Sequence, residues 1–235
     1  MDCPIGGKYS QGGQGNIELK AIFDWRSKMA YFPLYIDLKE KKCLVVGGGK
    51  VALRKIETLL RFEAEIVVIG SSVSDEIRHL AGLGKLTYKN RPYQCGDVSG
   101  FFLAIAATSA PEINAQVCRD SMKLNVWVNS ATDPNQCSFI FPAVVKNGPL
   151  VIGLTSSGKF PALTRLLRRE IAALPVLAQE GNLDKWAALR RRIQQEVSDP
   201  RERERILRDV GAEVFSHPEA DPGEIIARIY GKVAK

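Results

Sequence analysis

The sequence predicts an α/β protein built on a Rossmann-like, doubly wound parallel sheet. A short apolar run at residues 43–46 leads into a glycine-rich turn and then into a helical pattern, as expected of a buried strand, a turn and a helix. Apolar runs of strand length then alternate with helical patterns as far as residue 128. This alternation is typical of parallel strands joined by crossover helices.

The glycine-rich turn matches the dinucleotide-binding pattern G-x-G-x-x-G/A. In that pattern Gly47 allows a tight turn, Gly49 lets the backbone approach a pyrophosphate, and Ala52 lets the helix pack closely against the strand. The start of the helix presents free N–H groups to the phosphates. We therefore expect Lys50 and Val51, in its first turn, to contact the cofactor as well.

The end of the second predicted strand bears on which dinucleotide binds. An acidic residue that binds the ribose 2′-hydroxyl is expected there, but the sequence has a glycine followed by Ser71 and Ser72. The two hydroxyls are the predicted ribose contacts, and the choice between NAD and NADP stays open. Thr108 follows the fourth predicted strand and is expected to line the same crevice, because ligands bind at the carboxyl ends of parallel strands.

The other elements can be placed in chain order. An apolar lead-in at 32–38, either an edge strand or an extended segment, precedes predicted strands at 43–46, 66–69, 86–88, 101–107 and 126–128 and predicted helices at 51–60, 74–83 and 111–123. The pattern then changes. Two strand-like runs, 138–145 and 150–154, are separated by an Asn-Gly pair, which predicts a hairpin.

The rest of the chain is predicted to be helical. A helix opens at Pro161, and its inward side chains are predicted to be Leu163, Leu166, Leu167 and Ile171. Residues 176–235 show no strand pattern. Trp186, Leu189, Ile193 and Val197 form one apolar stripe there at helical spacing, and further helices are expected to open near residues 198–200 and 221–223.

These patterns divide the chain into four regions. Residues 1–28 are predicted to be a disordered extension, either upstream of the fold or the result of a misplaced start before Met29. Residues 29–135 are predicted to form the dinucleotide-binding domain, 136–175 a hairpin-and-helix region for dimerisation and substrate contact, and 176–235 a helical region.

Composition narrows the class of protein. The 235 residues are 45% hydrophobic and 25% charged, which is ordinary for a globular protein. No apolar run approaches the ~20 residues that span a bilayer, and the N-terminus lacks a signal-peptide pattern. Five cysteines without a C-x-x-C pair indicate reduced thiols and a cytoplasmic protein. No metal-ligand spacing is present, and the net charge of +7 comes without a nucleic-acid-binding motif.

Several motifs in series resemble the precorrin-2 dehydrogenase/sirohydrochlorin ferrochelatase family, which also forms the N-terminal part of siroheme synthases. The motifs lie at residues 47–52, 104–108, 128–129, 137–143 and 156–168. The resemblance covers about residues 30 to 200 and is specific as a set. The methyltransferase part of the fused synthases is not expected within these 235 residues.

The resemblance implies oxidation of precorrin-2 to sirohydrochlorin with NAD as the hydride acceptor; some family members also insert Fe²⁺. It implies a homodimer and a tetrapyrrole substrate with eight carboxylates, which suits the positive net charge. Lys159 and Arg165 are then expected to meet carboxylates. Ser156 corresponds to a serine of the family's substrate loop, and Ser157 is its neighbour. Capping the following helix is the alternative role for Ser156.

Family members usually carry an acid–base aspartate after the fifth strand, in a run like Asn-Val-x-Asp-x-Pro. Aligning Asn129 and Pro134 with that run puts Thr132 at the place of the aspartate, with Asp133 one position later. We therefore predict Asp133 as the acid–base group, with Thr132 lining the site. This departure bears more on iron insertion, which must remove two pyrrole protons, than on dehydrogenation, for which the cofactor supplies most of the chemistry.

Three functional hypotheses follow. The first is an NAD-dependent precorrin-2 dehydrogenase, with a bifunctional dehydrogenase and ferrochelatase as its close alternative. The second is a catalytically silent tetrapyrrole- or nucleotide-binding protein that partners another enzyme. The third is a Rossmann reductase with a different substrate, which nothing beyond the first 130 residues supports.

Overall fold

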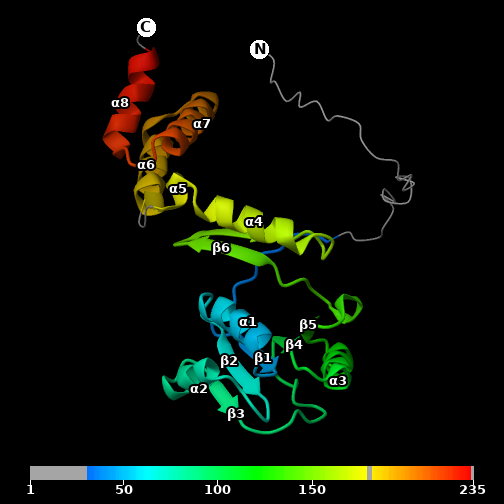
Figure 1. The fold of residues 1–235 in the computed structure, drawn as a ribbon. Helices are drawn as coiled ribbons and strands as arrows, with labels where there is room; N and C mark the ends of the chain where they lie inside the picture. The colour runs from blue at the N-terminus through cyan, green and yellow to red at the C-terminus, as the bar shows by residue number, and fades with distance from the viewer. Residues whose placement is uncertain (1–30, 179–181, 234–235) are drawn as a thin grey trace, which may run out of the picture. The chain divides into compact units, whose positions relative to one another are not determined.

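Five parallel strands form the larger of the two sheets (Figure 1). The computed structural model describes residues 31–178 and 182–233. The strands run in the order β3-β2-β1-β4-β5. Their bounds are β1 (Lys42–Val46), β2 (Glu65–Ile69), β3 (Thr87–Lys89), β4 (Leu103–Ala106) and β5 (Trp127–Ser130). Cys43 of β1 lies opposite Ile66 of β2 and Leu103 of β4. The predicted doubly wound parallel sheet is thereby confirmed.

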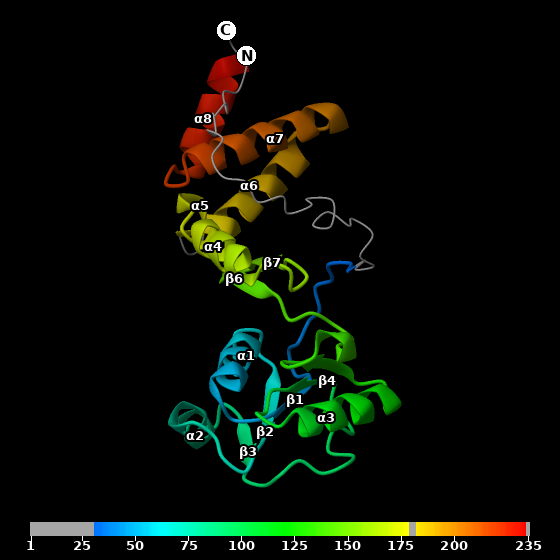
Figure 2. The ribbon, with the colours of Figure 1, turned by 45° about the vertical axis from the view of Figure 1, so that its right-hand side comes forward.

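Helices cover both faces of this sheet. The helices α1 (Lys50–Leu60) and α2 (Asp75–Gly82) lie on one face, and α3 (Pro111–Lys123) lies on the other (Figure 2). Successive residues of β1 alternate between the two cores: Val45 packs with the α1 and α2 side, and Leu44 packs with the α3 side. The side chains of both cores extend to the carboxyl ends of the strands. The predicted ligand crevice lies at these ends.

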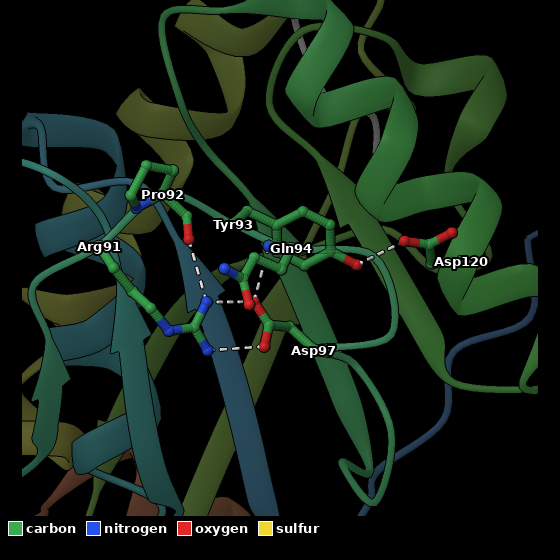
Figure 3. A network of polar contacts seen from close by, with 6 residues as sticks. All are labelled: Arg91, Pro92, Tyr93, Gln94, Asp97 and Asp120. Carbon is green, nitrogen blue, oxygen red and sulfur yellow. Dashed lines mark hydrogen bonds and ion pairs between the residues drawn. The ribbon is translucent and has the colours of Figure 1, made fainter.

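An ion pair and a buried hydrogen bond are among the polar contacts that hold the long connection from β3 to β4 (Figure 3). Both terminal nitrogens of the Arg91 guanidinium donate to the carboxylate of Asp97, each across 2.7 Å. The hydroxyl of Tyr93 donates to Asp120 of α3 across 2.8 Å, and both side chains are buried. The connection is therefore attached to the helix that flanks β4 and β5.

A two-stranded antiparallel sheet follows the parallel one. It consists of β6 (Ala143–Asn147) and β7 (Leu150–Leu154), joined at the predicted Asn-Gly turn. The prediction of a strand over 138–145 was wrong for its first five residues. Ser138 donates from its backbone to Val128 instead, and Pro142 lacks the N–H that a ladder requires. The lead-in at 32–38 forms no strand.

The helix α4 (Pro161–Ala172) opens at the predicted proline, but its apolar face is not covered in the single chain. Leu163, Leu166 and Leu167 are each more than 40% exposed, which contradicts their predicted inward position. Helical periodicity identifies an apolar face without identifying what covers it.

The C-terminal helices share a core of their own. After α5 (Pro175–Ala178), the helices α6 (Asn182–Glu196), α7 (Pro200–Ser216) and α8 (Pro222–Val233) pack around a common apolar cluster. Leu189 and Ile193 of the predicted stripe are buried in it. The described chain from Pro33 onward forms one compact unit. The proposed four-region division stays a prediction, and residues 1–28 lie outside the described residues.

Candidate dinucleotide site

The carboxyl ends of β1, β2 and β4 meet at the glycine turn. The backbone of Gly47 has φ +120° and donates to Ile69 of β2 across 2.9 Å. A Cβ atom at Gly47 would lie 2.3 Å from the carbonyl oxygen of Ala107, which follows β4. Only glycine fits here without moving one strand end away from the other.

The next two glycines differ in their surroundings. A Cβ atom at Gly48 would lie 2.3 Å from the carbonyl oxygen of Ser72, so this position is closed by the chain that follows β2. A Cβ atom at Gly49 would meet no atom of the described residues within 4 Å. Gly49 is therefore the glycine with open space beside it, as expected where a pyrophosphate approaches the backbone.

The first turn of α1 is suited to an anion. Gly49 caps the helix without a side-chain hydrogen bond, and the turn contains no acidic residue. The N–H groups at this end carry a partial positive charge that favours phosphate. The predicted contacts Lys50 and Val51 are exposed in this turn, and Ala52 is buried against the sheet. The residues present thus fit a bound dinucleotide.

The structure places the other predicted cofactor contacts at neighbouring strand ends. Ser71 and Ser72 are exposed in the loop after β2. Thr108 follows β4 and is partly buried, and its backbone N–H and hydroxyl both donate to the side-chain oxygen of Asn114. Thr108 is therefore oriented by α3 as well as by its own strand.

Asn114 also reaches Thr132, the residue predicted to stand at the place of the family aspartate. Its Nδ2 donates to the Thr132 hydroxyl across 3.2 Å and to the Thr108 carbonyl across 3.1 Å. The Thr132 hydroxyl lies a further 3.2 Å from that of Ser130. The structure thus brings Thr108 and Thr132 together through a fully buried amide that the sequence analysis did not single out.

Asp133 points its carboxylate toward the short turn η2 (Pro134–Gln136). One oxygen accepts from the backbone N–H of Asn135 across 2.9 Å, and the other accepts from the side-chain amide of Gln136 across 2.7 Å. Each oxygen keeps further acceptor capacity, because a carboxylate has about four lone-pair sites. The side chain is therefore both a cap for the turn and a partly exposed base.

A second buried cluster lies at the end of β5. Lys55 of α1 donates to the side-chain oxygen of Asn129 across 2.7 Å, and burial lowers the pKa of Lys55 to about 8. The Sγ of Cys137 accepts from the backbone N–H of Ser130 across 3.1 Å, and burial raises the pKa of this thiol above its ordinary value. The sequence analysis missed Lys55 and Asn129 as site residues.

A usable signal for Lys55 and Asn114 does exist in the sequence. Lys55 falls on the apolar stripe of its helix, between Ala52 and Ile56, and Asn114 occupies a stripe position three residues before Val117. A polar residue at a core position of an amphipathic helix must find a buried partner. Such positions are therefore candidates for buried polar contacts.

The predicted substrate residues lie in the loop after β7 and on α4. The Ser156 hydroxyl accepts from the backbone N–H of Phe160 across 3.2 Å and from the Thr164 hydroxyl across 3.0 Å. Phe160, not Ser156, occupies the N-cap position of α4, but the Ser156 hydroxyl binds the N–H of that residue, which agrees with the alternative role at the start of the helix. Ser157 has φ +54°, which bends the loop.

Lys159 and Arg165 are both exposed cations. Within residues 31–178 and 182–233, no group of three or more His, Cys, Asp or Glu side chains is arranged to hold a metal ion. The same residues contain no helix that is long and apolar enough to cross a membrane.

Comparison with known proteins adds to this geometry. Residues 34–143 match a family described as "Putative NAD(P)-binding". The chain is 40% identical over 146 residues to Siroheme synthase 1 of Serratia proteamaculans and 35% identical over 201 residues to the siroheme synthase of Methylococcus capsulatus. The chain is thus similar in sequence to part of the siroheme synthases. These matches cover 62% and 83% of this chain, but only 31% and 42% of the relatives' own length.

A solved structure also shares the fold. The structure titled "SirC, precorrin-2 dehydrogenase" superposes with a TM-score of 0.67 at 22% sequence identity. The superposition covers 86% of this chain and all of the other. It extends past the parallel sheet, so the hairpin and helices are part of the shared fold. The residues that match the NAD(P)-binding family thus lie within a larger fold that the two structures share.

Proposed function

We propose that this chain catalyses the NAD-dependent dehydrogenation of precorrin-2 to sirohydrochlorin in siroheme formation. The observation that carries the proposal is the extent of the similarity to siroheme synthases, which reaches 201 residues and 83% of the chain. A reductase that shared only a dinucleotide fold would match over the nucleotide-binding residues, here 34–143. The extent therefore favours the siroheme pathway over an unrelated Rossmann reductase.

The reaction removes two hydrogens, one as a hydride and one as a proton, and leaves a new double bond in the tetrapyrrole. Bound NAD supplies the hydride acceptor. In this proposal the open backbone at Gly49 and the first-turn N–H groups of α1 hold the pyrophosphate. Ser71 and Ser72 contact the ribose, and Thr108 lines the crevice. NAD, rather than NADP, is the proposed cofactor.

Asp133 is the proposed proton acceptor. Its two carboxylate oxygens are fixed by one hydrogen bond each, so the group is oriented and still able to accept. Thr132 lines the site beside it. Because the Thr132 hydroxyl is bound to Asn114 and lies near Ser130, we assign it an orienting role rather than a proton transfer.

Substrate carboxylates are proposed to meet Lys159 and Arg165, with Ser156 and Ser157 as hydrogen-bonding groups in the same loop and helix. Both cations are exposed, and the chain has a net charge of +7, which attracts a ligand with many carboxylates. The exposed apolar face of α4 supports a homodimer, and four described cysteines that are free thiols support a cytoplasmic location.

The direct test is NADH formation from precorrin-2 by the purified chain, with NADP as a parallel acceptor. We expect NADH to form with NAD, and we expect the rate to fall when Gly49 is replaced by alanine. Formation of neither NADH from NAD nor NADPH from NADP, by a protein that binds cofactor and precorrin-2, would overturn the proposal. Siroheme formation from sirohydrochlorin and Fe²⁺, measured separately, identifies the bifunctional alternative.

A silent binding protein is the second candidate. It is favoured by one observation: the hydroxyl of Thr132, the residue predicted at the place of the family aspartate, is bound within a structural network. In that case precorrin-2 binds without NADH formation. Thr132→Asp is then expected to create turnover, because it places a carboxylate beside the Asn114 amide.

A further inference from the structure

Lys55 is a buried cation on the helix that carries the cofactor turn. Its side chain is 7% exposed and lies on the apolar face of α1, beside Ala52, Ile56 and Leu59. Among the ion pairs of the described residues, none involves Lys55. Burying an ammonium without an anion costs free energy. A methionine would fill a similar volume without that cost, so packing alone does not account for the charge.

The ammonium joins three parts of the fold. Its nitrogen donates to the side-chain oxygen of Asn129 across 2.7 Å and lies 4.2 Å from the centroid of the Phe141 ring. The amide nitrogen of Asn129 in turn donates to the Phe139 carbonyl across 3.1 Å and to the Cys137 sulfur across 3.6 Å. Lys55 therefore connects α1 with the end of β5 and with the segment that leads to β6.

The residues between these attachment points carry the proposed chemistry. Thr132 and Asp133 lie between Asn129, at one end of the loop, and Cys137 and Phe139, at the other. The side-chain amide of Asn129, at the first end, donates to Cys137 and Phe139 at the second end. Lys55 in turn donates to the oxygen of the same amide. The position of this loop is thus linked to the helix whose first turn is the proposed pyrophosphate site.

We propose that Lys55 is a positioning residue whose ammonium couples the cofactor-binding helix to the loop at residues 130–137, so that the proposed dehydrogenation reaches its full rate only while Lys55 is charged. The inference rests on the proposed function. In this role Lys55 contacts neither cofactor nor substrate; it acts through Asn129 and Phe141.

The charge matters because both contacts depend on it. A charged donor makes a stronger hydrogen bond than a neutral amine, and only the cation is attracted to an aromatic face. Two titratable groups act on Lys55: Arg54 on α1 lowers its pKa further, and Cys137 in the loop raises it. Burial raises the pKa of the Cys137 thiol above its ordinary value.

The test compares pH profiles of kcat from about pH 6 to about pH 10. We expect wild-type kcat to fall as the pH rises through about 8. Lys55→Met should lower kcat roughly tenfold and remove this fall. Asn129→Asp gives the ammonium a carboxylate partner, which raises the pKa of Lys55, so the fall should move to higher pH.

Lys41 provides the matched control. Its ammonium lies 5.8 Å from the centroid of the Phe102 ring but is exposed, so Lys41→Met should leave the profile unchanged. A fall near pH 8 that persists in folded Lys55→Met overturns the inference. A wild-type kcat that does not change with pH near 8 also overturns the inference.

A second readout separates this inference from the proposed function. Nuclear magnetic resonance of the full chain follows the Lys55 side chain and the backbone amides of Thr132 and Asp133 as the pH changes. We expect the amide signals to shift with the Lys55 midpoint in wild type and to stop doing so in Lys55→Met. If they shift but no NADH forms, the proposed function fails and the coupling stands. If Lys55 titrates and the amides do not follow, the coupling is overturned.

Discussion

The side-chain amide of Asn114, fully buried in α3, donates to the hydroxyl of Thr132 across 3.2 Å. A second hydroxyl, that of Ser130, lies at the same distance from Thr132 on the β5 side. Thr132 is therefore fixed by two neighbours, and a neutral hydroxyl is too weak a base to accept a proton near neutral pH. We therefore expect the adjacent carboxylate of Asp133 to perform any acid–base role at this end of β5.

Asp133→Asn separates the two roles of that carboxylate. The asparagine oxygen can still accept from the N–H of Asn135 and cap the turn, but it cannot take a proton. We expect kcat for NADH formation to fall by about two orders of magnitude, with little change in thermal stability. The control is Gln136→Ala, which removes one partner of the carboxylate and keeps the base. Equal activity in Asp133→Asn and wild type would make Asp133 a structural cap alone.

Alanine at the three glycines is expected to have two different effects. In Gly47→Ala and Gly48→Ala the new methyl group would lie 2.3 Å from a backbone oxygen, so both variants should lose stability, by about 2 kcal/mol or more. Gly49→Ala meets open space and should fold normally, with NAD affinity reduced roughly tenfold. Urea denaturation and NADH fluorescence titration measure the two quantities. Undiminished NAD affinity in Gly49→Ala would place the pyrophosphate elsewhere.

Lys55 should also make folding stability depend on pH. Its pKa falls from an ordinary 10.5 to about 8 in the folded chain because of burial. Between these values the unfolded chain binds more protons than the folded one, so the free energy of unfolding rises with pH. The wild type should gain roughly 3 kcal/mol over this window relative to Lys55→Met. Urea denaturation at several pH values checks this, and parallel curves for the two proteins would contradict it.

The sheet could be predicted from the sequence because each strand is a short apolar run. Residues 43–46 and 66–69, for example, recur almost unchanged in β1 and β2. Residues 138–142 were predicted as strand for the same reason and are not. There the competing partner is Val128, whose backbone oxygen accepts from Ser138, and a contact between segments this far apart leaves no local pattern.

The site could be predicted only in part. The glycine turn has a local pattern, so its residues were found, and Thr108 was found from its place at a strand end. The link from Asn114 to Thr132 and the link from Lys55 to Asn129 each join residues at least 18 positions apart. Periodicity shows that Asn114 and Lys55 occupy core positions, but only the fold shows which polar group each one meets.

The ion pair of Arg91 and Asp97 should contribute more to stability than an exposed pair of the same kind. The hydrogen bonds from Arg91 hold the pKa of Asp97 below its ordinary value, so the contribution is present at neutral pH and is lost as the pH falls through the lowered pKa. Asp97→Asn should lower Tm by about 3 °C or more at neutral pH. The difference from wild type should disappear in acid, where the wild-type carboxyl is also protonated.

Asp75→Asn is the matched control, since the Asp75 side chain is 99% exposed and lies 3.8 Å from Arg78. Its Tm should stay within about 1 °C of wild type, because exposed pairs contribute little. If the two variants lower Tm equally, the two hydrogen bonds between Arg91 and Asp97 stabilise the fold no more than an exposed ion pair does. If Asp97→Asn alone is destabilised, and only above the lowered pKa of Asp97, the hydrogen bonds from Arg91 hold the β3–β4 connection in place.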